Sequence, residues 1–326
     1  MNTFGNKFRI SIFGESHGEK IGVVIDGVRA GLSLCVEDFT PSLLRRKSGA
    51  KGTTPRIESD IPEIVAGVYQ GFTTGAPICI LFSNNNTRSE DYNQVATKEL
   101  GSPRPGHADF VAARKFNSFN DHRGGGHFSG RLTLCLVAAG VVAKKMLENI
   151  EIEAKVTQIK GVKTPEEWEQ IIDQAIKDNN SVGGIVECSC TGVPIGLGEP
   201  FFASLESKIS EMIFSIPGIR GIEFGDGFDA ANMTGSQHND CIISSDGKTL
   251  TNGAGGINGG ISNGNPLIFR VAVKPTSSIS HPQSTFNFET NRIEELSIKG
   301  RHDVCIALRV PVVVESAVAI VLLNAL

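Results

Sequence analysis

The sequence has few of the features that would place a protein at a membrane or on a nucleic acid. Its one long apolar stretch, Val310 to Leu326, is short for a membrane span and contains Pro311 and Glu315, so we predict a buried helix there. No long apolar core follows the first basic residue, and we therefore expect no signal peptide. The net charge of −4 excludes a general attraction to nucleic acid or to anionic lipid, so any anion binding must be local.

Cysteine pairing signals are also absent. The seven cysteines are an odd number, none forms a C-x-x-C pair, and most lie in apolar runs. Cys188 and Cys190 alternate along a predicted strand, which places both thiols on one face. We expect all seven cysteines to be reduced core residues of a cytoplasmic protein.

Glycine, in contrast, is abundant, with 37 residues in 326, against an average of ~7%. The excess is clustered at 124–126, 192–198 and 253–264. Predicted strands or helices flank each cluster, which favours ordered loops that approach a ligand over flexible linkers.

Hydrophobic periodicity predicts an α/β protein in which strands and helices are mixed along the chain. Predicted strands lie within 7–28 (two strands) and at 61–68, 76–82, 184–190, 219–224 and 267–273. Predicted helices begin at Thr40 and near Val310, and span 108–119, 131–147, 166–177 and 203–216. The helix at 131–147 is apolar nearly all round, so we expect burial on several sides.

Three elements recur in the same order, which suggests an internal repeat. The stretch 26–32 (DGVRAGL) resembles 191–197 (TGVPIGL), and 71–77 (GFTTGAP) resembles 260–266 (GISNGNP). An arginine-bearing loop and a long apolar helix then close each half. We predict one catalytic domain over 1–326 with two similar halves, approximately 8–150 and 151–326.

Two common motifs are matched but lack their context. Gly14-Glu-Ser16-His-Gly18 fits the nucleophile elbow of serine hydrolases, which leaves a hydrolase using Ser16 as an alternative. A predicted strand follows it, however, where the elbow requires a helix. The G-x-G-x-x-A sequence at 225–230 follows a predicted strand, but no helix pattern follows, so a dinucleotide-binding fold is not expected.

Four histidines lie in loops rich in glycine, arginine or aspartate: His17, His107, His127 and His302. Imidazole near neutral pH is the usual proton donor and acceptor in enzymes, so these contexts favour acid–base catalysis. No H-E-x-x-H or paired Cys/His spacing is present, and we predict no metal site.

Basic residues accompany these histidines. One cluster contains Arg45, Arg46, Lys47 and Lys51, with Arg56 nearby, and single arginines at 104, 123, 131 and 301 adjoin glycine loops or helix starts. Guanidinium groups bind phosphate and carboxylate in a bidentate manner, and helix N-termini add donors. The pattern predicts an enzyme site for a small phosphorylated ligand.

A series of motifs carries a specific resemblance. GESHG, RPGHAD, RGGG-x-x-S-x-R before an apolar helix, EFGDGF, GGISNG, KPTSSI and GRHD-x-C occur in this order from Phe8 to the C-terminus. In this the chain resembles the chorismate synthase family over nearly its whole length. The resemblance implies a lyase that removes phosphate from 5-enolpyruvylshikimate 3-phosphate by anti-1,4-elimination, the last step of the shikimate pathway. It also implies helices layered between antiparallel sheets (an α+β sandwich), a homotetramer and a requirement for reduced FMN, with NADPH as a possible reductant.

The resemblance assigns roles by motif match. It implies that His17 protonates or steadies the reduced flavin, that His107 is the acid at the departing phosphate, and that Asp303 acts in removing the C6 proton. Four arginines would hold substrate: Arg46, Arg104, Arg131 and Arg301, with Arg46 also at NADP where that is bound. The FMN site would comprise His127, Phe128, Ser129, Pro217, Gly218, Gly259, Lys274, Pro275, Thr276, Ser277, Ser278 and Arg301.

The chain departs from the family pattern at three of these places. The loop at 126–131 (GHFSGR) replaces the usual GGRSSAR and loses a positive residue and a hydroxyl. The stretch 215–221 (SIPGIRG), which contains Pro217 and Gly218, replaces the usual SINA-x-KG sequence. Gly52 stands where many members carry a second cation, for which Lys51 could substitute. A flavin- or anion-binding protein without turnover is therefore a further alternative, against which the presence of His17, His107 and Asp303 argues.

Overall fold

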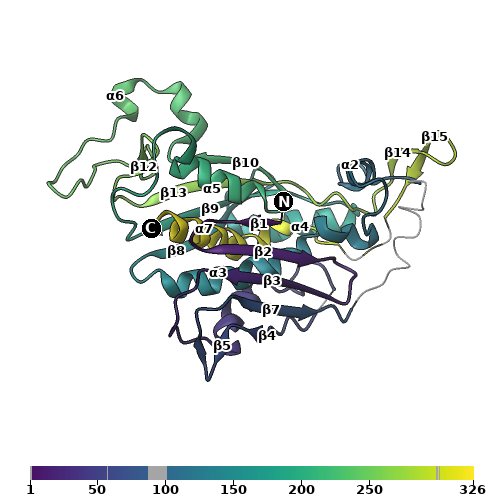
Figure 1. The fold of residues 1–326 in the computed structure, drawn as a ribbon. Coiled ribbons are helices and arrows are strands. Elements are labelled where there is room, and N and C mark those ends of the chain that lie inside the picture. The colour runs from purple at the N-terminus through teal and green to yellow at the C-terminus, as the bar shows by residue number, and fades with distance from the viewer. Residues whose placement is uncertain (1, 57, 87–100, 299, 301) are drawn as a thin grey trace.

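Two antiparallel sheets and a central pair of helices make up the body of the molecule (Figure 1). The computed structural model describes residues 2–56, 58–86, 101–298, 300 and 302–326. None of the helices in these ranges is long and apolar enough to cross a membrane. The mixed α/β architecture predicted from the sequence is confirmed.

The first half of the chain forms a five-stranded sheet of order β1-β2-β3-β7-β4. Its strands are β1 (Thr3–Phe4), β2 (Arg9–Gly14), β3 (Lys20–Asp26), β4 (Glu63–Ala66) and β7 (Ile78–Ser83). In β3 and β7 the residues Ile21, Val23, Ile25, Ile78 and Ile80 are fully buried, as expected of central strands whose alternate side chains face the core.

The second half forms a four-stranded sheet of order β10-β13-β9-β8. Its strands are β8 (Glu151–Ile159), β9 (Gly184–Thr191), β10 (Ile219–Phe224) and β13 (Leu267–Val273). The orders β2-β3-β7-β4 and β8-β9-β13-β10 are the same when the strands are counted along the chain. Each half therefore contributes one antiparallel sheet with the same strand connections.

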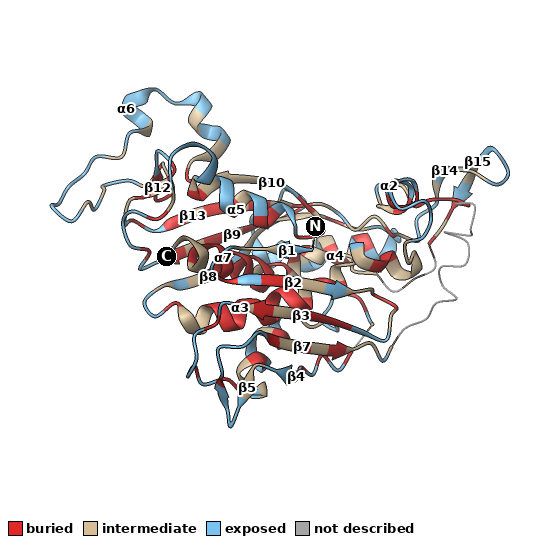
Figure 2. Ribbon diagram, in the orientation of Figure 1, coloured by how far each residue is buried: buried red, intermediate tan, exposed pale blue. Residues whose placement is uncertain are grey.

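The helices α3 (Thr133–Met146) and α7 (Pro311–Ala325) form the middle of the molecule. Helix α3 packs on β2 and β3, α7 packs on β8 and β9, and the two helices pack on each other. Every residue from Leu134 to Ala143 and from Val312 to Leu322 is buried, as Figure 2 shows. The predicted burial of both apolar helices is confirmed, and it explains why neither has a polar face.

The two central helices cross closely at Gly140. A Cβ on Gly140 would lie 2.2 Å from Cβ of Ser316, far inside van der Waals contact. Only glycine lets the backbones approach this far, so the distance between the two sheets depends on this residue.

A buried carboxylate in α7 connects this helix to three neighbouring elements. Glu315 in α7 is 1% exposed and accepts hydrogen bonds from Arg45 (2.8 and 2.6 Å), from Lys144 (2.8 Å) and from the backbone N–H of Ala154 (2.9 Å). These donors come from α1 (Thr40–Arg46), α3 and β8. A buried charge is tolerated only when it is paired in this way.

The remaining elements lie around this body. They are α2 (Asp109–Lys115), α4 (Pro165–Lys177), α5 (Leu205–Phe214), α6 (Gly235–His238) and three hairpins: β5 (Val68–Tyr69) with β6 (Phe72–Thr73), β11 (Ile257–Asn258) with β12 (Ile261–Ser262), and β14 (Gln283–Asn287) with β15 (Arg292–Leu296). Short 3-10 helices connect several of them, including 123–128 and 306–309.

The expectation that all seven cysteines belong to the core is wrong for two of them. Cys35 and Cys241 are exposed, because they lie in surface loops outside the sheets. Cys188 and Cys190 are both buried under β9, on one face of the strand as predicted.

Candidate functional site

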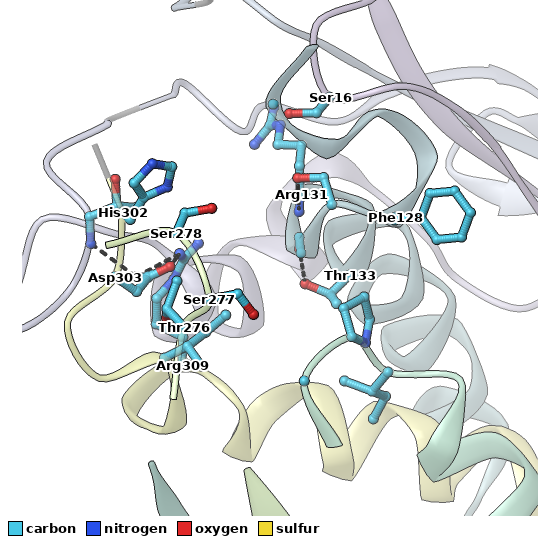
Figure 3. Close-up of a pocket in the computed structure, with 18 of the residues that line it drawn as sticks. Ser16, Phe128, Arg131, Thr133, Thr276, Ser277, Ser278, His302, Asp303 and Arg309 are labelled. Carbon is cyan, nitrogen blue, oxygen red and sulfur yellow. Dashed lines mark hydrogen bonds and ion pairs between the residues drawn. The ribbon is translucent and has the colours of Figure 1, made fainter. Parts of the chain in front are cut away.

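A cavity of about 630 Å³ opens where the loops of both halves meet the starts of α3 and α7. Figure 3 shows Arg131 and Thr133 on one side of it and Asp303, Arg309 and Ser277 on the other. It contains sixteen of the residues predicted for the site: His17, Arg46, Arg104, His107, His127, Phe128, Ser129, Arg131, Pro217, Gly218, Lys274, Pro275, Thr276, Ser277, Ser278 and Asp303. Residues almost 290 positions apart are thereby brought to one space.

Two buried arginines form the wall next to α3. Arg46, at the end of α1, is 2% exposed; its Nε donates to the hydroxyl of Thr133 (3.0 Å) and its Nη2 to the carbonyl of Gly130 (3.0 Å). Arg131 donates to Asn84 (2.9 Å) and forms an ion pair with Asp60, which also faces Arg46 at 3.6 Å. Burial, with the nearby charge of Arg309, lowers the pKa of Arg46 to about 9, so it remains a cation at neutral pH.

The segment before α2 forms a second cluster around one carboxylate. Asp109 accepts from Nε and Nη2 of Arg104, both at 2.7 Å, and lies 2.7 Å from Nδ1 of His107. Arg104 also donates to Ser278 (3.0 Å). Burial alone would raise the pKa of Asp109, but the hydrogen bonds from Arg104 and His107 hold it well below its usual value. Burial lowers the pKa of His107, against the effect of Asp109.

Two donors hold Asp303 in place. Its Oδ1 accepts the backbone N–H of Thr54 (2.9 Å), and both its oxygens accept from Nη1 of Arg309 (3.1 and 3.0 Å). Nε of Arg309 in turn donates to the carbonyl of Arg46 (2.8 Å), which joins this group to the first wall. The neighbouring His302 is half-buried, and desolvation lowers its pKa to about 4, so it is neutral at physiological pH.

A glycine loop supports His17. A Cβ on Gly124 would lie 2.1 Å from Cε1 of His17, and Gly124 has a φ of +60°, so glycine is required on both counts. Nδ1 of His17 is 3.2 Å from the hydroxyl of Ser16, and the backbone N–H of Ser16 donates to Gly126 (3.1 Å). The loop therefore fixes the position of the imidazole through direct contact.

The segment 274–278 after β13 forms the opposite wall. Nζ of Lys274 donates to the carbonyl of Gly106 (2.6 Å) and to Ser277 (2.8 Å), which joins this segment to the one carrying His107. The backbone N–H of Lys274 donates to Gly218 (2.9 Å). Burial, with the charge of Arg220, lowers the pKa of Lys274.

Contacts within the structure explain two of the residues in the unusual sequence 127–129. Nδ1 of His127 donates to the carbonyl of Gly14 (2.8 Å), so this side chain ties the loop to the end of β2. Ser129 caps the following turn by accepting from the N–H of Arg131 (3.2 Å). Phe128, 40% exposed, gives the cavity an apolar surface beside Pro217.

Two predicted residues have a different place. Gly259 lies in the turn between β11 and β12 and does not line the cavity, so the structure does not bring it to the other site residues. Lys51 does not substitute for a second cation at Gly52, because its Nζ bonds Glu169 (2.7 Å) and Asp173 (3.0 Å) of α4. Arg301 lies outside the described residues.

Several cavity residues were not singled out by sequence reasoning. They are Thr54, Glu58, Asp60, Arg309 and Arg220, together with Arg56, which was noted only as a neighbour of the basic cluster. Asp109, which bonds Arg104 and His107 from behind the cavity lining, was not singled out either. Most of them are partners of predicted residues and are distant from them in the chain, as Asp60 is from Arg131. Asp109 had a signal, since it closes the RPGHAD motif two residues after His107.

This arrangement can bind a ligand with several negative charges. Arg46, Arg104, Arg131 and Lys274 surround the cavity, and Thr133 and Val310, at the N-terminal ends of α3 and α7, also line it. Helix N-termini carry partial positive charge, which adds to the cationic field. The imidazoles of His17 and His107 and the fixed carboxylate of Asp303 border the same space and can exchange protons with a bound molecule.

The serine hydrolase alternative is not supported. The strand β3 follows the GESHG loop where a nucleophile elbow requires a helix. The hydroxyl of Ser16 accepts from Nη1 of Arg56 (3.3 Å), and a cationic partner of this kind does not activate a serine.

Comparisons with known proteins agree with this geometry. The family model described as chorismate synthase matches residues 8–326. Chorismate synthase of Chitinophaga pinensis is 59% identical over 323 residues, covering 99% of this chain and 95% of the relative, and that of Methanocaldococcus jannaschii is 40% identical with coverage of 99% and 95%. A crystal structure of chorismate synthase superposes with a TM-score of 0.75 at 28% identity, covering 99% of this chain and 92% of the other. The chain therefore belongs to the chorismate synthase family.

Proposed function

We propose that the chain is a carbon–oxygen lyase that removes phosphate from 5-enolpyruvylshikimate 3-phosphate to give chorismate. One observation carries the proposal: His17, His107 and Asp303 border a single cavity whose walls hold Arg46 and Arg131. An elimination of this kind needs a base for the C6 proton, a proton for the leaving phosphate, and cations for three acidic groups of the substrate.

In this proposal the arginines bind and orient the substrate. Arg46, Arg104 and Arg131 are buried and held by carboxylates or carbonyls, so their positions are fixed before the ligand arrives. Preorganised donors lose little freedom on binding, which favours the geometry of the transition state. Arg301 joins this set by motif match.

Two side chains move protons. His107, protonated on both ring nitrogens, gives its Nε2 proton to the oxygen of the phosphate as the C3–O bond breaks, while Nδ1–H stays on Asp109. Asp303 acts in removing the C6 proton, and its two oxygens, fixed by Thr54 and Arg309, define the direction of approach. His17 also lines the cavity, where it would steady the cofactor.

The cavity fits a reduced FMN cofactor next to the substrate. Its volume lies within the ~300–1,000 Å³ usual for ligand sites, and it combines the cations with an apolar surface of Phe128, Ile216, Pro217 and Ile306. Residues 127–129, 217–218 and 274–278 would hold the flavin. When bound, reduced FMN supplies electron density to the reacting carbon framework without net redox change. NADPH would serve as its reductant where Arg46 accepts that nucleotide.

We also propose a cytoplasmic homotetramer. Several large apolar side chains are exposed outside the cavity, among them Phe201 (85%), Phe202 (93%) and Phe228 (80%). Aromatic groups exposed to this degree favour burial against another copy of the chain. Sedimentation of the purified protein measures the assembly mass directly.

Anaerobic turnover tests the proposed reaction. The chain is incubated with dithionite-reduced FMN and 5-enolpyruvylshikimate 3-phosphate, and the absorbance of chorismate is followed. We expect product only with reduced flavin, and a reaction with oxidised FMN serves as the control. Flavin binding without product would contradict the lyase function and favour a binding protein.

A further inference from the structure

Asp109 connects the two cavity residues of its segment through one carboxylate. It is the first residue of α2 and is 7% exposed. Its Oδ1 is 2.7 Å from both Nη2 of Arg104 and Nδ1 of His107, while its Oδ2 is 2.7 Å from Nε and 3.0 Å from the backbone N–H of Arg104. Four polar contacts therefore converge on a side chain that does not itself need to touch a ligand.

The contact with His107 determines which ring nitrogen carries the proton. An ionised carboxylate only accepts hydrogen bonds, so Nδ1 of His107 must donate to it. Nε2 then faces the cavity, where a Cβ on Gly125 would lie 3.2 Å away from it. Nε2 is consequently the atom that exchanges a proton with a bound ligand.

The contact with Arg104 fixes a cation in the same way. Nε and Nη2 are taken by Asp109, which leaves Nη1 for Ser278 on the opposite wall (3.0 Å). The guanidinium plane is therefore locked against the carboxylate plane, as in bidentate pairs generally.

We propose that Asp109 is a positioning residue, which selects the Nδ1–H tautomer of His107 and orients Arg104 so that both act on one ligand group in the cavity. The proposal rests on the proposed function for the identity of that group, but the tautomer it assigns belongs to the protein alone. It gives Asp109 a role in the proton transfer that motif matching did not assign.

The other charged groups around His107 do not select a tautomer. Lys274 and His302 lie near it on other segments. At physiological pH Lys274 is a cation and His302 is neutral. Each acts on the ring through its charge at a distance, whereas Asp109 makes the hydrogen bond to Nδ1. Removal of that one acceptor should therefore be sufficient to change the tautomer.

The substitution Asp109→Asn has a calculable result. If the amide nitrogen took the Oδ2 position, it would oppose two N–H groups of Arg104, whereas at the Oδ1 position it opposes only Nη2. A buried donor left without an acceptor is unfavourable, so the second arrangement is favoured. The amide then donates to Nδ1 of His107, which moves the ring proton to Nε2.

Histidine-selective ¹⁵N NMR at pH 8 without ligand measures which ring nitrogen of His107 carries the proton. His107→Gln assigns the signals, and Asp121→Asn is the matched control, because Asp121 clamps Arg123 by the same N–H, Nε and Nη2 contacts (3.0, 2.9 and 2.8 Å) without a bond to His107. We expect His107 to carry its proton on Nδ1 in the unsubstituted chain and in Asp121→Asn, and on Nε2 in Asp109→Asn.

Kinetics with reduced FMN give the second readout. We expect kcat of Asp109→Asn to fall on the order of 10²-fold, the lower range of a general-acid contribution, because an amide that donates to Nδ1 opposes the doubly protonated ring that supplies the acid. Asp109→Glu should recover part of the loss. An Nε2–H tautomer in the unsubstituted chain would overturn the proposal, and this result does not require any variant to fold. The same tautomer in all three proteins would overturn it as well. Because the NMR result does not depend on turnover, it stands apart from any failure of the lyase assay.

Discussion

Replacing Glu315 by glutamine tests whether the buried ion cluster stabilises the molecule. The change keeps the size of the side chain and removes its charge. Burial by itself raises the pKa of Glu315, but the hydrogen bonds from Arg45 and Lys144 hold it below its usual value, so the carboxylate is ionised at neutral pH. Glutamine keeps one acceptor for Ala154 and directs its amide at a cation.

The expected loss follows from the exposure of the partners. Removing one partner of a fully buried pair costs about 3–5 kcal/mol, because the other charge is stranded. The side chains of Arg45 and Lys144 are 49% and 29% exposed, so water recovers part of their solvation. We therefore expect the free energy of unfolding to fall by about 2–3 kcal/mol.

Urea unfolding followed by circular dichroism measures this change. The control is Glu63→Gln, whose partner Lys20 is 42% exposed while Glu63 itself is 56% exposed. An exposed pair of this kind contributes about 1 kcal/mol or less. Equal losses in the two variants would refute the reasoning, since burial would then have no effect on the energy of the ion pair.

Three further outcomes are expected. His107→Ala should lower kcat at least ~100-fold while raising KM far less, as measured in steady state with reduced FMN; equal effects on both would make it a binding residue only. Gly124→Ala should displace His17 and weaken flavin binding in a fluorescence titration, and an unchanged Kd would argue against the contact. His302 has a folded pKa of about 4 against 6.5 unfolded, so the unfolded chain binds more protons between these values. Its contribution to stability is present above pH 6.5 and lost as pH falls through that window, and a melting-temperature profile of His302→Gln should be flatter there than that of the unsubstituted chain.

The sequence predicts the individual helices and strands of this fold better than it predicts which of them pack together. Apolar periodicity identifies α3 and α7, because helices buried on all sides need apolar residues at every position. The strand β8 was not predicted, although its alternating sequence EIEAKVTQI fits a strand with one polar face. The charged and polar residues on its outer face make this stretch polar overall, so its alternation is not obvious from the sequence.

The site shows the same limit. Arg45 and Arg46 are neighbours in sequence and form one basic cluster there, but successive residues on a helix point about 100° apart. Arg45 therefore reaches Glu315 in the core layer, while Arg46 enters the cavity. Motif matching identifies the residues that face a ligand, whereas Asp60 and Arg309 act through contacts that only the folded chain brings together.

The close crossing of α3 and α7 at Gly140 also determines the width of the cavity between the starts of the two helices. Both helices begin at the cavity, with Thr133 on one wall and Val310 on the other, and meet about two turns further along at Gly140 and Ser316. A bulkier residue at the meeting point would push the helix starts apart and widen the gap between Thr133 and Val310. The width of the cavity thus depends on the absence of a side chain at Gly140, which is not itself part of the cavity wall.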